Sequence, residues 1–254
     1  MIPKSHPRYE SLMKRERIIE GFKKGIVAHA GLIAHGRGET FDYLIGERSE
    51  NFALRAEEAA VARLFLAENP VISVNGNVTA LAAPDVIQFA RALNTKIEVN
   101  LFYRTEERIR KIVNEFEKLG ASILGAEPDA RIPNLEHARA LCTREGIYSA
   151  DVVLVPLEDG DRTKALKDMG KFVITIDLNP LSRTAQTADI TIVDELTRAI
   201  KNMIKFADGM NEERARRVLE EYDNRDILAQ SLNHIKNRLE MLAYHFSNSS
   251  GLKT

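Results

Sequence analysis

The chain has 254 residues, enough for one large α/β domain or for one domain with appended helices. Its 36 Lys and Arg residues nearly balance its 37 Asp and Glu residues, so no overall field draws it to nucleic acid or to an anionic membrane. The single cysteine, Cys142, excludes an intramolecular disulfide, and neither a signal peptide nor a long apolar run stands out. We therefore expect a cytoplasmic protein with one α/β domain over residues 1–254, divided into regions 1–68, 69–208 and 209–254.

Residues 1–68 are predicted to form helices joined by functional loops. Residues 51–68 have the pattern of an amphipathic helix, and one face of an earlier helix is marked by Leu12, Ile18, Ile19 and Phe22. Between them, "LIAHGRGET" (32–40) sets Arg37 between two glycines, directly before a predicted helix. Glycines permit close backbone approach to a ligand and a guanidinium group suits phosphate oxygens. A flexible loop with an exposed arginine explains the pattern equally well.

In region 69–208 the hydrophobic pattern changes to short apolar runs, at 71–74, 96–102, 121–125, 152–156, 172–176 and 190–193. Helical stretches separate nearly all of them, most clearly at 84–93, 105–119, 161–169 and 194–207. Unalternating strands interleaved with helices predict a doubly wound, mainly parallel (Rossmann-like) sheet of about six strands, with further helices at both ends of the chain. In such sheets ligands bind beyond the carboxyl ends of the strands, where the strand order reverses.

Polar residues follow the first two predicted strands. The sequence "NGN" at 75–77 either makes a plain turn or contacts a ligand, because Asn and Gly tolerate unusual backbone angles. Thr105 is a good helix N-cap, so Arg104 beside it either helps to bind an anion at the helix start or is simply solvated.

Acidic residues follow the fourth and fifth predicted strands. Three of them, in "PLEDGDRTKAL", could hold Mg²⁺ or receive a cationic group, and we expect Asp161 to cap the following helix. After the fifth strand, an acid, an amide, a helix cap and a cation follow within seven residues, at Asp177, Asn179, Ser182 and Arg183. An acid at such a strand tip can bind a ribose hydroxyl, so we predict a functional loop here.

Region 211–246 is helical and charged. Its apolar residues repeat with spacings of four and three, at Leu228, Leu232, Ile235, Leu239, Leu242 and Phe246. The repeat is typical of a dimer interface of coiled-coil type. Because it covers fewer than three heptads, a helix packed on the sheet of its own chain explains it at least as well.

Several familiar catalytic motifs are missing from the sequence. There is no G-x-x-x-x-G-K-[ST] phosphate loop and no G-x-S-x-G elbow, and "GRGETF" departs from G-x-G-x-x-G at its last position. The histidines lack cysteine partners and HExxH spacing, so we predict no protein-bound metal site. Cys142, in the polar stretch "LCTREG", has no evident activating partner. The residues by themselves indicate an α/β protein that binds a phosphorylated small molecule.

Long stretches of the chain resemble the archaeal phosphopantothenate synthetases, also called 4-phosphopantoate–β-alanine ligases, which act in coenzyme A synthesis. The resemblance covers residues 2 to about 205 with interruptions and lies in "IPKSHPRYESL", "AGLIAHGRGETFDYLIGE", "PVISVNGNV", "NLFYRTEERI", "ADVVLVPLEDGDRTKAL" and "GKFVITIDLNPLSRTAQTADITIVD". It implies an enzyme that converts ATP, 4-phosphopantoate and β-alanine to AMP, pyrophosphate and 4-phosphopantothenate through an acyl-adenylate. Mg²⁺ would neutralise the polyphosphate.

The resemblance also implies roles for individual residues. ATP contacts are implied for Arg15, Arg37, Asp177, Leu178, Asn179, Arg183, Thr184, Glu195 and Leu196. Contacts to 4-phosphopantoate are implied for Lys4, Ser5, His6, His35, Asn75, Asn77 and Arg104. Among these, Arg37 and His35 are the expected catalytic residues, with Arg37 stabilising charge at the ATP phosphates. The general base for the β-alanine ammonium group stays open between His35, Asp159 and Asp161.

Two other functions compete with the ligase at this level. A non-catalytic nucleotide-binding regulatory domain would use the helices of 211–246 to join partner chains. A kinase or phosphatase for a small phosphorylated molecule would release ADP or inorganic phosphate, although the missing phosphate-loop lysine argues against a P-loop kinase. The family resemblance and the terminal heptads both favour a homodimer.

Overall fold

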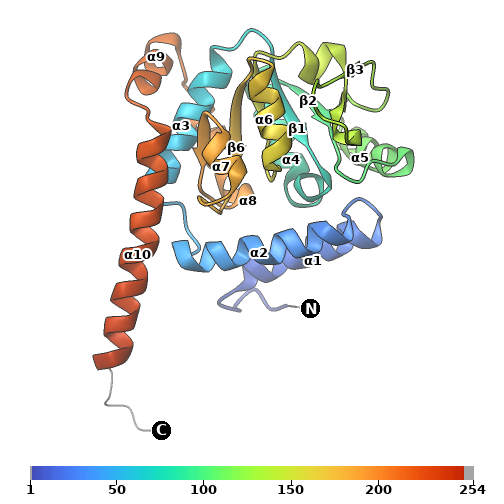
Figure 1. Cartoon of the computed structure of the whole chain (residues 1–254). Helices are drawn as coiled ribbons and strands as arrows, with labels where there is room; N and C mark the ends of the chain where they lie inside the picture. The colour runs from blue at the N-terminus through green and yellow to red at the C-terminus, as the bar shows by residue number, and fades with distance from the viewer. Residues whose placement is uncertain (1, 249–254) are drawn as a thin grey trace.

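The computed structural model describes residues 2–248 and has a five-stranded parallel sheet at its centre (Figure 1). The strands lie in the order β2-β1-β5-β6-β7 and have the bounds β1 Pro70–Val74, β2 Lys96–Val99, β5 Val152–Leu154, β6 Phe172–Ile176 and β7 Ile190–Ile192. Every neighbouring pair in this sheet is parallel. The chain first extends the sheet to one side of β1 and then returns to the other side, so the strand order reverses between β1 and β5. The predicted doubly wound α/β fold is confirmed.

Helices precede, alternate with and follow the strands. Their bounds are α1 Tyr9–Lys23, α2 His29–Ile45, α3 Asn51–Phe65, α4 Gly76–Ala92, α5 Glu106–Lys118, α6 Gly160–Asp168, α7 Arg183–Thr187, α8 Leu196–Ala207, α9 Glu212–Glu220 and α10 Asn224–Asn248. Within residues 2–248, no helix combines the length and apolar character needed to cross a membrane.

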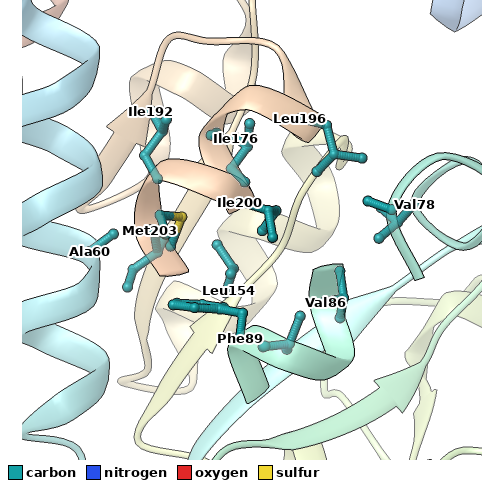
Figure 2. Packing of buried hydrophobic residues seen from close by; sticks show 14 of the residues in the cluster. Ala60, Val78, Val86, Phe89, Leu154, Ile176, Ile192, Leu196, Ile200 and Met203 are labelled. Carbon is teal, nitrogen blue, oxygen red and sulfur yellow. The ribbon is translucent and has the colours of Figure 1, made fainter. Parts of the chain in front are cut away.

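The sheet is buried on both faces because successive strand residues point into two different cores. On β1, Ile72 and Val74 join a cluster with α3, α4, α5 and α8, whereas Val71 joins a second cluster with α6. Figure 2 shows the first core, where Phe89 of α4, Ile200 of α8 and strand residues interlock. Two-sided burial explains why the strands are continuously apolar in sequence.

Residues 126–150, which carried no sequence signal, cover part of the second face. They form a small antiparallel pair, β3 (Ala130–Arg131) with β4 (Leu141–Cys142), and two short helical turns, η1 (Ala138–Ala140) and η2 (Arg144–Tyr148). Cys142 is fully buried here rather than in a polar loop, which corrects the sequence interpretation. Burial raises the pKa of the Cys142 thiol to about 11, so it has no nucleophilic character at neutral pH.

Two elements differ from their predicted form. Residues 121–125 make one isolated bridge, between Leu124 and Glu98, because Gly120 and Gly125 bend the backbone with φ of +74° and +100°. The helix predicted at 84–93 begins at Gly76 instead, with Pro84 in its interior, because a strong cap at Asn75 starts it two turns earlier.

The helix α10 packs on the body only through its first half. Ile227 is buried and Leu228 and Ile235 contact the core, which confirms the intramolecular packing for this part of the heptad pattern. The second half extends past the body (Figure 1), and its exposed apolar residues are Leu239, Met241, Tyr244 and Phe246.

Candidate active site

The carboxyl ends of β1 and β5 meet where the strand order reverses. β1 runs directly into α4, and the N-cap residue Asn75 accepts hydrogen bonds from the backbone N–H groups of Asn77 and Val78 at 3.0 and 3.1 Å. The Asn75 amide also donates to the carbonyl oxygens of Pro156 and Leu157, both at 3.2 Å, just beyond β5. Asn75 therefore joins the two strand ends that flank the switch point, and "NGN" is a helix start rather than a plain turn.

The helix α2 lies across these strand ends and closes the crevice (Figure 1). Asn77 donates to the carbonyl oxygen of Gly31 at 2.9 Å, and any side chain at position 31 would collide with that of Asn77. A cavity of about 460 Å³ remains between α2, the first turn of α4, the segment after β5 and the start of α8. This is where a doubly wound sheet binds its ligand.

The predicted glycine loop around Arg37 is wrong, because Gly36, Arg37 and Gly38 all lie inside α2. Glycine disfavours a helix interior by roughly 1 kcal/mol, but Leu32 and Phe41 of this helix pack against the core and offset that cost. Arg37 nevertheless lines the cavity, is exposed to solvent and acts on Asp177 by its charge. The glycines flanking it leave that part of the helix surface open: a Cβ at position 36 would meet nothing.

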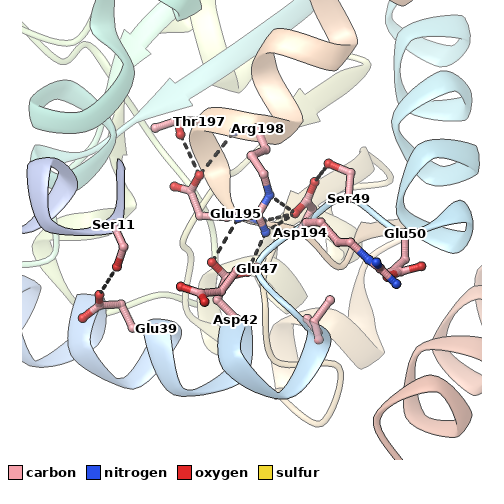
Figure 3. Close-up of polar contacts among 12 residues, drawn as sticks. Ser11, Glu39, Asp42, Glu47, Ser49, Glu50, Asp194, Glu195, Thr197 and Arg198 are labelled. Carbon is pink, nitrogen blue, oxygen red and sulfur yellow. Dashed lines mark hydrogen bonds and ion pairs between the residues drawn. The ribbon is translucent and has the colours of Figure 1, made fainter. Parts of the chain in front are cut away.

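A network of charges joins α1 and α2 to the start of α8 at one side of the cavity (Figure 3). Lys14 donates to Glu195 at 2.6 Å, and Glu195 is the N-cap of α8, accepting from the backbone N–H of Arg198 at 3.3 Å. Arg198 in turn binds Asp42 of α2 and Asp194, with shortest distances of 2.6 Å to each. These contacts hold the middle of α1, the last turn of α2 and the start of α8 at fixed positions around the cavity.

His35 of α2 lines the same cavity, and its Nε2 atom is buried with no hydrogen-bond partner within residues 2–248. Burial lowers the pKa of His35 below its ordinary value, although the charges of Glu39 and Glu195 oppose that shift. A neutral imidazole facing a cavity can accept a proton.

Opposite α2, a second charged network forms the wall beyond β5. Arg139 is buried and binds both Glu158 and Asp159, and Arg162 of α6 binds Glu158 at 2.5 Å and Ser73 at 3.2 Å. Asp159 caps α6, accepting from the backbone of Arg162 at 2.8 Å. Arg139 lines the cavity and keeps its Nε atom unpaired among the described residues.

The predicted cap at Asp161 is therefore wrong, since Asp159 holds that position. Asp161 lies two residues later, in the first turn of the helix, where it is exposed and pairs with Arg183 at 2.7 Å. The predicted caps at Thr105 and Ser182 are confirmed, with distances of 3.2 and 2.9 Å to the backbone N–H groups they accept.

Seven of the ligand contacts implied by the resemblance line the cavity: His35, Arg37, Asn75, Asn77, Leu178, Glu195 and Leu196. Glu158 and Asp159, two of the acids predicted to follow the fourth strand, line it as well. Asp177 adjoins it as a buried carboxyl group that accepts from Ser182 at 2.5 Å and from the backbone of Asn179 at 2.9 Å. Burial raises the pKa of Asp177, while these hydrogen bonds and Arg37 oppose the rise.

Other predicted contacts lie outside the cavity lining. Arg15 is held by Glu39 at 2.9 Å on the outer side of α1, and Arg104 donates to the carbonyl oxygen of Gly125 at 2.7 Å. Thr184 donates to the carbonyl oxygen of Glu158 at 3.0 Å. The remaining predicted residues that are absent from the lining are Lys4, Ser5, His6, Asn179 and Arg183.

Sequence reasoning missed five charged residues of the lining: Lys14, Glu39, Asp42, Arg108 and Arg139. Lys14 lies beside Arg15 in a helix that was recognised, so its position was a usable signal. Arg139 comes from the segment 126–150, where nothing in the sequence indicated a site. Across residues 2–248, no group of three or more His, Cys, Asp or Glu side chains is arranged to hold a metal ion.

Comparisons with known proteins agree with this geometry. A family model described as phosphopantothenate/pantothenate synthetase matches residues 52–238. The chain belongs to this family. It is 60% identical over 247 residues to the 4-phosphopantoate–β-alanine ligase of Thermococcus onnurineus, covering 95% of both chains. It is 56% identical over 246 residues to the ligase of that name from Methanosarcina mazei, covering 95% of this chain and 97% of that one. The resemblance noted in the sequence is thereby confirmed.

Proposed function

We propose that this protein is an ATP-dependent ligase that joins 4-phosphopantoate to β-alanine and releases AMP and pyrophosphate. The observation that carries the proposal is the match to ligases of that name along 95% of the chain. The cavity at the switch point supports it, because cationic side chains and a helix N-terminus surround a space large enough for small anionic ligands.

The reaction proceeds in two steps. A carboxylate oxygen of 4-phosphopantoate attacks the α-phosphorus of ATP, pyrophosphate leaves, and a phosphopantoyl adenylate forms. The β-alanine nitrogen then attacks the acyl carbon, AMP leaves with the bonding electrons, and the amide remains. Both steps depend on positioning and on charge stabilisation rather than on a protein nucleophile.

ATP binds along α2 and the tips of β6 and β7. Arg37 and Leu178 both line the cavity, and the charge of Arg37 acts on Asp177. This arrangement suits a nucleotide whose ribose meets the acid and whose phosphates meet the guanidinium group. The other proposed ATP contacts are Arg15, Asn179, Arg183, Thr184, Glu195 and Leu196. In this assignment Arg37 stabilises the charge that develops on the phosphates during adenylation.

4-Phosphopantoate binds at the first turn of α4. The positive end of the α4 dipole attracts phosphate, although Asn75 already accepts from the N–H groups of Asn77 and Val78. Arg108 and Arg139 line the cavity nearby, and their Nε atoms are unpaired among the described residues. Asn75 and Asn77 belong to this turn. Lys4, Ser5, His6 and Arg104 stay predicted contacts that rest on the resemblance.

His35 is the general base that takes a proton from the β-alanine ammonium group. Burial keeps its imidazole neutral, and its Nε2 atom has no partner within the described residues. The two alternatives are weaker bases. Arg139 and the backbone of Arg162 hold the pKa of Asp159 below its usual value despite burial, and Asp161 is exposed and paired with Arg183.

Mg²⁺ enters with ATP in this scheme. The described residues contain no cluster of three acidic or His ligands, and Mg²⁺ characteristically keeps several waters and takes its other ligands from phosphates and one or two carboxylates. Glu39 lines the cavity on α2 and fits as such a carboxylate contact. The ion supplies charge neutralisation at the leaving pyrophosphate.

The protein forms a homodimer through α10, since the apolar side chains of its second half project from the body without a partner in the described part of the chain. Placing charges at Leu239 and Phe246 is expected to halve the mass measured by light scattering. A cytoplasmic location stays a prediction that rests on the single reduced thiol.

The test of the function is product analysis. Purified protein with ATP, Mg²⁺, 4-phosphopantoate and β-alanine should release AMP, pyrophosphate and 4-phosphopantothenate in equal amounts, each dependent on both acids. Release of ADP or inorganic phosphate would indicate a kinase or phosphatase instead. Thermal stabilisation by ATP without turnover would indicate a regulatory nucleotide-binding domain.

A further inference from the structure

Glu57, in the middle of α3, is a buried acid that neither the cavity nor the proposed mechanism uses. Its side chain is 0% exposed, and neither carboxyl oxygen accepts a hydrogen bond from any group in residues 2–248. An ionised carboxylate in this position would cost several kcal/mol. The side chains that face it across the helix interface are Asp194 and Asn202.

Asp194 accepts four hydrogen bonds, three at Oδ1 and one at Oδ2. Its Oδ1 atom accepts from the backbone N–H of Glu195 at 2.7 Å and from Arg198 at 2.6 and 3.0 Å, and its Oδ2 atom accepts from Ser49 at 2.5 Å (Figure 3). Four donors, two of them on a guanidinium group, favour an ionised Asp194. Asn202 directs an amide hydrogen to Ser49 at 3.0 Å.

The contacts of Asp194 lead directly to the nucleotide end of the cavity. The residue after it, Glu195, caps α8 and receives Lys14 at 2.6 Å. Lys14, Glu195 and Leu196 line the cavity, whereas Glu57 does not. A change at Glu57 therefore reaches the ligand indirectly, through the turn between β7 and α8 and through the contact of Arg198 with Asp42 of the lining.

We propose that Glu57 keeps its proton in the folded protein, donates it to Asp194, and so positions the Glu195–Leu196 turn for nucleotide binding. Glu57 is a positioning residue, and the inference rests on the proposed function only for the identity of the ligand. The pairing of a neutral and an ionised carboxyl group explains how two buried acids lie together without a cation between them.

The protonation state gives the pair a pH dependence. Burial, followed by the charge of Asp194, raises the pKa of Glu57 from 4.5 to about 9. The charged groups that face Glu57 are Asp194 and Arg198; elsewhere on α3, Arg214 of α9 pairs with Glu58, and Asp226 of α10 lies 3.4 Å from Arg55. Since the folded state binds this proton more tightly, the stability it contributes is complete below pH 4.5 and is lost as pH rises towards about 9.

Two substitutions and a control test the inference. Glu57→Gln keeps the shape and a hydrogen-bond donor but cannot ionise, and Glu57→Leu removes the donor. The control is Glu58→Gln, on the same helix, whose carboxylate pairs with Arg214 at 2.6 Å away from Asp194. The dissociation constant of ATP is measured by calorimetry at several pH values, alongside infrared difference spectra and denaturant unfolding.

We expect the infrared spectrum at pH 7 to contain the C=O band of a protonated carboxyl group that is missing in Glu57→Gln and retained in Glu58→Gln. Affinity for ATP should fall in the wild type as pH rises through about 9 and stay level in Glu57→Gln. At pH 7, Glu57→Leu should raise the dissociation constant of ATP roughly 10-fold, which is the effect of one lost hydrogen bond. Unfolding free energy should fall with rising pH more steeply in the wild type than in Glu57→Gln.

A missing carboxyl band, or an alkaline loss of ATP affinity that persists in Glu57→Gln, would overturn the inference. If Glu57→Leu fails to fold, the infrared band and the pH dependence of ATP affinity in the wild type and in Glu57→Gln still test the inference. A wild type that binds no ATP at any pH would refute the proposed function instead, while the infrared band still tests the proton on Glu57.

Discussion

The role of His35 as general base makes a prediction that separates the two halves of the reaction. The base acts only when β-alanine attacks, so replacing His35 by Asn should leave adenylate formation intact. Loss of a general base typically slows the affected step ~100- to 10,000-fold. A histidine with the ordinary pKa of about 6.5 is roughly three-quarters neutral at pH 7, and burial, which lowers the pKa of His35, raises that fraction.

Two assays measure these effects on the same preparation. Exchange of labelled pyrophosphate into ATP, dependent on 4-phosphopantoate, reports adenylation, and formation of 4-phosphopantothenate reports the whole reaction. In His35→Asn we expect exchange within ~3-fold of the wild type and product formation reduced ~100-fold or more. Product formation should recover as pH rises, because β-alanine then supplies its own neutral amine.

The pH profile gives a second check on the same group. Because burial lowers the pKa of His35, the acid limb of kcat/KM for β-alanine in the wild type should lie below pH 6.5. An acid limb that stays at the same pH below 6.5 in His35→Asn, or an exchange reaction that falls as far as product formation, would refute the assignment.

Three further substitutions test other parts of the site. Arg37→Ala should lower kcat for pyrophosphate exchange ~100-fold or more, and near-normal exchange would remove its role in adenylation. Arg139→Met should raise KM for 4-phosphopantoate roughly 10- to 100-fold, as expected for a charged hydrogen bond, with KM for ATP changed much less in initial-rate assays. Arg162→Met removes a fully buried cation from Glu158 and should lower the unfolding free energy, measured by urea titration, by about 3 kcal/mol. Adding Glu158→Gln should restore part of that free energy. A double variant no more stable than Arg162→Met would contradict the pairing.

Much of the fold could be predicted because its signals are local. Strands buried on both faces are continuously apolar over four or five residues, as in "FVITI" of β6, and they alternate with helices of ordinary length. The segment at 121–125 has the same composition but no room to form a strand between two glycines with positive φ. The helical stretch was predicted to begin only at residue 84, whereas Asn75 supplies a stronger start signal for α4.

The site residues also divide into those that local sequence signals predict and those that only tertiary packing reveals. Asn75 was singled out because a parallel sheet brings all its carboxyl ends to one edge, whereas Leu178 was implied by the family resemblance. Arg139 and Asp42 belong to segments for which no rule of sheet topology predicts a position at the cavity. They line it because residues 126–150 and α2 pack against the sheet. Glu57 is the extreme case, since its chemistry depends on a carboxyl group 137 positions away, at Asp194.

The sequence by itself determined the alternation of strands and helices, the edge of the sheet at which the cavity lies, and the family. These follow from hydrophobic periodicity and from motifs that are contiguous along the chain. The tertiary structure decided that Arg37 lies on a helix, which acids cap a helix and which pair with a cation, and that the pKa of the His35 imidazole is lowered. Those properties depend on burial and on charges contributed by distant segments, and neither quantity exists until the chain has packed.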